Sequence, residues 1–398
     1  MTMMRNIKHV APNGLMANIL LSLLTTAGLY FILITSAMVT GLIESLALGK
    51  ATAGYIAAAN GYGASIGAFL VIFAIKRISW RPASAILLVM LMGWDTLSIF
   101  MTSGDSLMIV RFLHGLTGGA LIGIGFSVIS RTAVPDRTFA MLLFVQYGLG
   151  GIGLMFLPKL VPLYGMPIIF LTLIGFSLVT LMSLPFLPAY PPKAKAAAQD
   201  KARGKGGILL LPLGAALFSV FFFQSGNMGL AAYIIELGKG EGLTTDSIST
   251  TLGIANWIAM SGAALVYVTG LKYGRLWPVT AGLVVTILGM AAFHYSESAS
   301  VFFWANVVTG ITWAFIIPYL LGLCSEFDTQ GQLTALAGFF SKMGLASGPL
   351  VAAWVVGQGN YGLIINLAII AMVICLLAAL GPILMLDRKN NDKKGIVS

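Results

Sequence analysis

Four ionisable side chains lie well inside long apolar segments of this chain and are the first candidates for chemistry: Asp95, Arg111, His114 and Lys342. On insertion scales, a charge at the centre of a membrane helix costs about 2.5–3.5 kcal/mol, so an ionisable residue there is a functional-site candidate by default. A carboxylate or an imidazole in such a place can accept or relay a proton, and a lysine can offer a point charge to an anion.

The spacing predicts that Asp95, Arg111 and His114 share one depth. Asp95 lies about six residues before the end of one apolar segment, and the other two lie about five and eight residues after the start of the next, at about 1.5 Å per helical residue. In a proton-coupling group, Asp95 would be the acceptor, tuned by Arg111, with His114 as a relay. The alternative is structural: Asp95 and Arg111 form a neutralised pair that holds the helices, and His114 is a packed, hydrogen-bonded group.

Lys342 belongs to an internal repeat. The segment Phe144-Val-Gln-Tyr-Gly-Leu-Gly-Gly151 returns 196 positions later as Phe340-Ser-Lys-Met-Gly-Leu-Ala-Ser347, with Gln146 replaced by Lys342. An offset close to half of the 398 residues indicates a duplicated architecture. We expect Gln146 and Lys342 to bind substrate, with Lys342 facing an anion. A structural bridge from Lys342 to a carboxylate or to helix carbonyls is the alternative.

Amide and aromatic side chains complete the candidate substrate site. Gln224 and Asn227 follow a run of three Phe residues, where amides either hydrogen-bond a substrate or join helices. The aromatic candidates can stack on a planar ligand or belong to the core; they are Tyr30, Tyr147 and Trp313. Four further polar residues favour structural roles, as helix-packing amides (Asn60, Asn256) and as water-facing charges at the outer rim (Glu44, Glu236).

The composition is that of a polytopic membrane protein. Hydrophobic residues make up 58% of the chain and charged residues 9%, against about 25% charged in soluble domains, and the mean hydropathy is +0.94. The net charge of +10 lies in short loops and tails, so it does not indicate nucleic acid. The sequence contains neither a phosphate-binding Gly-Lys-Ser loop nor a catalytic or metal-ligating constellation, so we expect no enzyme and no cofactor. Cys324 and Cys375 are interpreted as core residues.

Twelve stretches are long and apolar enough to cross a bilayer, which takes about 20 residues. The predicted spans are 17–46, 52–75, 82–101, 106–130, 139–161, 166–188, 208–235, 247–270, 277–296, 299–323, 334–356 and 361–386. The first is too long for the apolar region of a cleavable signal peptide.

Loop charges and one linker predict the orientation and the domains. Nearly all Lys and Arg residues outside the spans lie in both tails, the linker and the loops after the second, fourth and eighth spans, and only Lys50, Lys159 and Lys239 lie on the opposite side. Both termini are therefore expected in the cytoplasm. We predict two six-helix bundles, residues 1–189 and 208–398, joined by a cytoplasmic linker at 190–207 that is rich in Pro, Ala and Lys.

Two motifs resemble those of the major facilitator superfamily, and the likeness extends over essentially the whole chain. Arg111-Phe-Leu-His-Gly-Leu-Thr-Gly-Gly119 is similar to the fourth-helix signature R-x-x-x-G-x-x-x-G. Lys76-Arg-Ile-Ser-Trp-Arg-Pro82 resembles the D-R-x-G-R-R-P loop, with Lys in place of the Asp, and Leu271-Lys-Tyr-Gly-Arg275 is its degenerate counterpart in the second half. From this loop motif we expect a cytoplasmic gate that includes Lys76, Arg77, Arg81 and Arg275.

The resemblance implies a secondary transporter in which two bundles enclose a central cavity and alternate its access. We expect it to be a monomer in the inner (plasma) membrane, with a small organic solute as substrate, an organic anion first, coupled to protons or another ion. One alternative is a proton-driven exporter of drugs or other amphipathic compounds. Another is a receptor or scaffold that has the same fold and does not transport.

Overall fold

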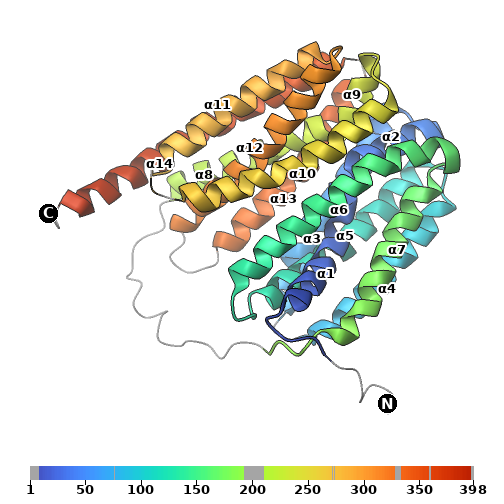
Figure 1. Ribbon diagram of the computed structural model, residues 1–398, viewed down its shortest axis with the longest axis horizontal. Helices are drawn as coiled ribbons and strands as arrows, with labels where there is room; N and C mark the ends of the chain where they lie inside the picture. Colours follow the sequence, from blue (N-terminus) through green and yellow to red (C-terminus); the bar gives the residue numbers. More distant parts are fainter. Residues whose placement is uncertain are drawn as a thin grey trace. The chain divides into compact units, whose positions relative to one another are not determined.

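A computed structural model describes residues 9–75, 77–191, 210–270, 272, 274–327, 333–357 and 360–395 (Figure 1). The chain divides into two compact units, Met1–Lys195 and Ala196–Ser398. All regular secondary structure in the described ranges is helical.

The first unit contains seven α-helices and a short 3-10 turn within the described ranges. They are α1 (Leu15–Leu33), α2 (Thr35–Leu46), α3 (Lys50–Ala74), α4 (Trp80–Ile99), α5 (Gly104–Ile129), α6 (Pro135–Tyr164), α7 (Pro167–Ser183) and η1 (Leu184–Phe186). Helix α5 packs along α3, α4 and α1, while α6 packs on α1 and α7 on α4.

The second unit has a matching set of described helices. They are α8 (Leu210–Ala232), α9 (Ile234–Gly240), α10 (Thr245–Thr269), α11 (Leu276–Ala292), η2 (Phe293–Tyr295), α12 (Ala299–Glu326), α13 (Leu333–Val356) and α14 (Tyr361–Gly395). The main contacts repeat those of the first unit, because α12 packs on α10 as α5 does on α3, and α13 packs on α8 as α6 does on α1. Helix α14 ends as the long red C-terminal helix in Figure 1.

Twelve helical segments in the described ranges have the length and hydropathy of membrane spans, six in each unit. They run from 19 to 28 residues, against about 20 needed to cross a bilayer. Large apolar side chains such as Phe100, Leu163 and Trp277 are more than 70% exposed, which suits surfaces that face lipid tails rather than water. The predicted all-α polytopic fold with twelve spans is confirmed.

The first span of each unit departs from the prediction. The stretches 17–46 and 208–235 were each expected to form one helix, but the structure breaks at Ile34 (φ −109°, ψ 21°) and at Tyr233 (φ −112°, ψ 13°). At the first break, the hydroxyl of Thr35 donates to the carbonyl oxygens of Phe31 and Ile32, at 3.2 and 2.9 Å. A threonine hydroxyl that bonds back to the preceding turn competes with the backbone and bends helices.

Glycines bring the backbones of α3 and α5 into direct contact. A Cβ atom added to Gly115 or Gly119 of α5 would overlap the carbonyl oxygen of Asn60 or Ala64 of α3. Without water in the bilayer, helices associate through such close packing of small residues. The glycines of the R-x-x-x-G-x-x-x-G motif therefore set the distance between α3 and α5.

We predict that Gly115→Ala lowers the midpoint of thermal unfolding, because overpacking a rigid contact typically costs about 1–3 kcal/mol. Gly93→Ala on α4 is the matched control, since a Cβ added there meets no atom within 4 Å. Unfolding of both purified variants is followed by intrinsic fluorescence, and equal midpoints would contradict the packing argument.

Candidate functional site

A buried ion pair lies at the centre of the first unit. Nη1 of Arg111 on α5 donates to Oδ1 of Asp95 on α4 at 2.7 Å, and both side chains are 0% exposed. The guanidinium carbon lies 5.1 Å from the ring centre of Phe170 and 6.0 Å from that of Phe31. The cation is therefore neutralised by one carboxylate and shielded by two aromatic rings, an arrangement that a low-dielectric interior requires.

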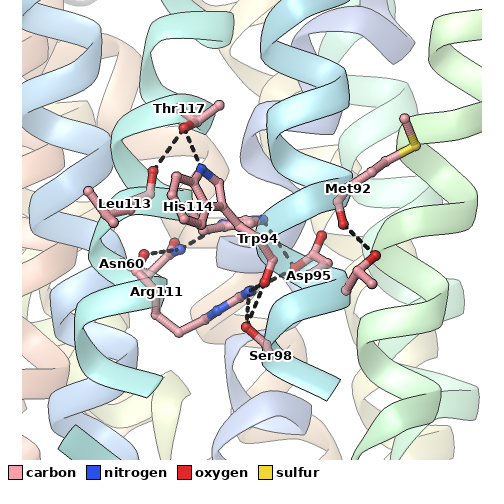
Figure 2. Close-up of polar contacts among 10 residues, drawn as sticks. Asn60, Met92, Trp94, Asp95, Ser98, Arg111, Leu113, His114 and Thr117 are labelled. Atoms are coloured by element: carbon pink, nitrogen blue, oxygen red, sulfur yellow. Dashed lines mark hydrogen bonds and ion pairs between the residues drawn. The ribbon is translucent and has the colours of Figure 1, made fainter. Parts of the chain in front are cut away.

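The second terminal nitrogen of Arg111 ties it to the backbone and a hydroxyl of α4. Nη2 donates to the carbonyl oxygen of Trp94 at 2.9 Å and to the hydroxyl of Ser98 (Figure 2). The indole of Trp94 donates in turn to the hydroxyl of Thr117 on α5, at 3.1 Å. Residues three positions apart on a helix share one face, so Asp95 and Ser98 present their acceptors together.

His114 extends the network to α3. Nδ2 of Asn60 lies 2.8 Å from Nδ1 of His114 and 3.0 Å from the carbonyl oxygen of Arg111. On the other side of the ring, Nε2 lies 3.5 Å from Oδ1 of Asp95. The structure thus brings Asp95, Arg111 and His114 together, and it adds Asn60, which the sequence had assigned to helix packing.

One oxygen of the Asp95 carboxylate is an acceptor without a hydrogen-bond partner among the described residues. Oδ2 of Asp95 is buried and has no hydrogen-bond partner among the described residues, as is also true of Nε of Arg111. An unmet acceptor in a buried site is costly, about 1–3 kcal/mol for a neutral group and more for a charged one. Oδ1 holds Arg111 and Oδ2 does not, so Oδ2 is the oxygen of Asp95 at which a proton can bind.

A second polar chain crosses the other unit. Nε1 of Trp313 on α12 donates to Oε1 of Gln224 on α8 at 2.8 Å, and Nε2 of Gln224 donates to the hydroxyl of Ser341 on α13 at 2.9 Å. Lys342 follows Ser341 directly, and both Lys342 and Trp313 are half-buried. Two of the predicted substrate-binding residues of this unit, Trp313 and Gln224, therefore belong to one connected group, and Ser341 is a member that sequence reasoning missed.

The fourth candidate of this unit, Asn227, is engaged elsewhere. Its Nδ2 donates to the carbonyl oxygen of Phe223 one turn earlier at 2.8 Å and lies 3.8 Å from the sulfur of Met372 on α14. Because Asn227 is only 5% exposed, it serves as a helix-packing group in this structure.

The substrate-binding candidates of the first unit also differ in their burial and contacts. Tyr30 is buried, donates to the carbonyl oxygen of Leu149 at 3.3 Å and packs on Phe176, so it belongs to the core. Gln146 and Tyr147 are half-buried on α6.

The predicted gate residues differ in their surroundings, and Arg81 and Arg275 contact different partners. Lys76 lies outside the described residues and Arg77 is exposed. Arg81 lies over the ring of Trp80 and donates to the carbonyl oxygen of Leu187, which follows η1. In the second unit, Arg275, just before α11, donates to Glu326 at the end of α12 at 2.8 Å, so this contact lies within one unit.

The same end of the first unit holds two further contacts to backbone carbonyls, which sequence reasoning missed. Arg131 donates to the carbonyl oxygen of Tyr190 at 3.3 Å, and the phenol of Tyr190 donates to the carbonyl oxygen of Pro12 at 2.8 Å. Burial raises the pKa of Tyr190 and outweighs the opposing effect of Arg81, so the phenol stays a donor at neutral pH. Backbone carbonyl partners leave no trace in the sequence, which explains why these contacts were not predicted.

One rim prediction is wrong. Glu44 is exposed as expected, but Glu236 on α9 is only 7% exposed. The break at Tyr233 starts a separate short helix, and α9 buries Ile234 to Gly238 instead of continuing α8 towards water.

The family model described as Major Facilitator Superfamily matches residues 19–341. That range is most of the chain and includes the Arg111 motif and the first copy of the repeat, Phe144 to Gly151. The chain belongs to this family of membrane transporters, which confirms the resemblance seen in its motifs.

Two solved transporter structures share the fold. The nucleoside transporter NupG is 16% identical, with a TM-score of 0.68 over 92% of this chain and 99% of that one. The proton:xylose symporter XylE is 17% identical, with a TM-score of 0.66 over 91% of this chain and 94% of that one. At these identities the likeness concerns the fold alone, and no curated protein sequence matches the chain.

We predict that Arg111→Gln and Asp95→Asn each destabilise the protein by about 3–5 kcal/mol, because each leaves a buried polar group without its partner. The double variant should recover a large part of that loss, since it removes both charges. A double-mutant cycle is built from the thermal unfolding midpoints of the unmodified protein, the two single variants and the double variant. Arg77→Gln, which removes an exposed arginine, is the control. Strictly additive losses would show that the pair is not coupled.

Proposed function

We propose that this chain is a secondary active transporter that couples the movement of a small organic solute to protons by alternating access. The observation that carries the proposal is the fully buried Asp95, held by Arg111 and beside His114, with one oxygen left as an unmet acceptor. Such a site is expensive in a membrane interior, and buried carboxylates and histidines are the common elements of proton relays. XylE, which shares the fold, is described as a proton symporter.

We propose a small organic anion as the substrate. Lys342 supplies a positive charge on a membrane-spanning helix, one residue after Ser341, whose hydroxyl accepts from Gln224. Trp313 adds a half-buried aromatic face from α12 that can cover a planar group. Gln146, at the position in the first unit equivalent to Lys342, and the neighbouring Tyr147 are proposed as further contacts.

The remaining features of the proposal follow from the loop charges. Residues 1–189 and 208–398 would be the two bodies that move, linked by 190–207, with both termini in the cytoplasm and the protein in the inner or plasma membrane. Arg77, Arg81 and Arg275, with Lys76, would contribute to the cytoplasmic gate. The protein would act as a monomer, without a cofactor or catalytic step.

A proton-driven exporter of amphipathic compounds is the second candidate. The observation in its favour is the aromatic and Met-rich composition, with 23 Phe and 19 Met residues, which suits loosely specified apolar ligands. A receptor or scaffold with this fold would differ from both by moving no solute.

Flux measurements in proteoliposomes test the proposal. With an imposed pH gradient, uptake of a panel of mono- and dicarboxylates should be faster than without the gradient. Lys342→Gln should reduce anion uptake by about tenfold or more, because a charged hydrogen bond is worth about 1.5–3 kcal/mol. Lys272→Gln, in an exposed loop position, is the matched control.

The outcomes separate the candidates. Gradient-driven flux of cationic drugs, unaffected by Lys342→Gln, would favour the exporter. Absence of flux for anions, neutral solutes and cations alike would overturn the transport proposal and favour the receptor or scaffold. Asp95→Asn should leave solute exchange in place while removing its dependence on the pH gradient, and retained dependence would exclude Asp95 as the proton acceptor.

A further inference from the structure

Asn60 makes two contacts whose chemistry fixes the orientation of its amide. The carbonyl oxygen of Arg111, 3.0 Å away, is only an acceptor, so the atom of Asn60 that faces it must be the donor Nδ2. The same Nδ2 lies 2.8 Å from Nδ1 of His114. A flipped amide would set two oxygens against each other, so the Nδ2 assignment follows from the backbone carbonyl.

This orientation determines where His114 carries its proton. Because Nδ2 of Asn60 donates, Nδ1 of His114 must accept and therefore has no hydrogen. The ring proton is then on Nε2, which faces Oδ1 of Asp95 at 3.5 Å. The hydrogen-bond partner of one ring nitrogen commonly decides which nitrogen of a histidine carries the proton.

We propose that Asn60 is a positioning residue that holds His114 in the neutral Nε2–H form, directed at Asp95. The inference rests on the proposed proton coupling, because it assigns Asn60 the task of orienting the relay. The tautomer of His114 can be measured directly, independently of any transport activity.

The surroundings of the ring leave few other groups to set its state. The charged groups facing it are Asp95 from α4 and Arg111 from its own helix, while α1 contributes the ring of Phe31, 5.9 Å away between centroids. The terminal nitrogens of the guanidinium donate to Asp95, Ser98 and the backbone of α4. Asn60 is thus the group that contacts Nδ1.

The contact also couples protonation to helix packing. Placing a second proton on Nδ1 requires Nδ2 of Asn60 to give up that bond, and the amide must rotate or move. The backbones of α3 and α5 touch at this level, where Gly115 lies against the backbone carbonyl of Asn60, so a displaced Asn60 side chain has to move between closely packed helices. Protonation of His114 at Nδ1 therefore breaks a hydrogen bond between α5 and α3.

Nitrogen-15 NMR of the imidazole tests the proposal. The sequence has three histidines, and His9→Gln with His294→Gln leaves only His114 to be labelled. In this background at neutral pH, His114 should show a protonated Nε2 and an unprotonated Nδ1. Observation of the Nδ1–H tautomer, or of a doubly protonated ring, would overturn the inference without any variant at Asn60.

Two variants sharpen the test. Asn60→Asp offers only acceptors to the ring, so His114 should gain a proton at Nδ1, and Asn60→Ala should give a mixture of forms. Asn256→Ala, at the repeat-equivalent position on α10, is the control and should leave the His114 spectrum unchanged. An unchanged spectrum in Asn60→Asp would contradict the proposal.

The same proteins separate this inference from the proposed function. If the tautomer is as expected but no solute shows pH-gradient-driven flux, proton-coupled transport fails while the positioning role stands. If flux is proton-driven but the tautomer is Nδ1–H, the positioning role fails while transport stands.

Discussion

The first unit depends on one constraint: the buried guanidinium of Arg111 must find its counter-charge and hydrogen-bond acceptors within the protein, without water. A guanidinium with no exposed surface needs a counter-charge and acceptors from the protein itself, and Arg111 finds them in Asp95, Ser98 and the carbonyl of Trp94. All three lie on α4, so a single side chain fixes the rotation and height of α4 against α5. The rings of Phe31 and Phe170 bring α1 and α7 to the same point.

The glycines after Arg111 belong to the same arrangement. Because Gly115 and Gly119 allow the backbones of α3 and α5 to touch, the short side chain of Asn60 can reach both the carbonyl of Arg111 and the ring of His114. A wider separation would place water or a longer side chain between them. Close packing and the polar network are therefore one feature, which links the signature motif to the chemistry it surrounds.

The two units share a scaffold but differ in their polar chemistry. Helix α12, which packs on α10 as α5 does on α3, contains no arginine, and the amide of its Asn306 donates to the carbonyl of Phe302 on the same helix. The polar contacts between helices of the second unit instead join neutral side chains, from Trp313 through Gln224 to Ser341. Lys342 follows Ser341 in the sequence. Duplication explains the helix contacts, and the differences between the copies mark where ion coupling and substrate binding are proposed.

The sequence by itself determined the twelve spans, the all-helical class, the family and the shared depth of Asp95, Arg111 and His114. Span length and hydropathy follow the helix axis, and the rise of about 1.5 Å per residue is constant, so position along that axis can be predicted from one sequence. Only the tertiary structure decided the breaks at Ile34 and Tyr233, the burial of Glu236 and the partners of Asn60 and Gln224. These depend on rotation about the helix axis, and helices that are apolar on every side carry no pattern that reveals which face meets a neighbour.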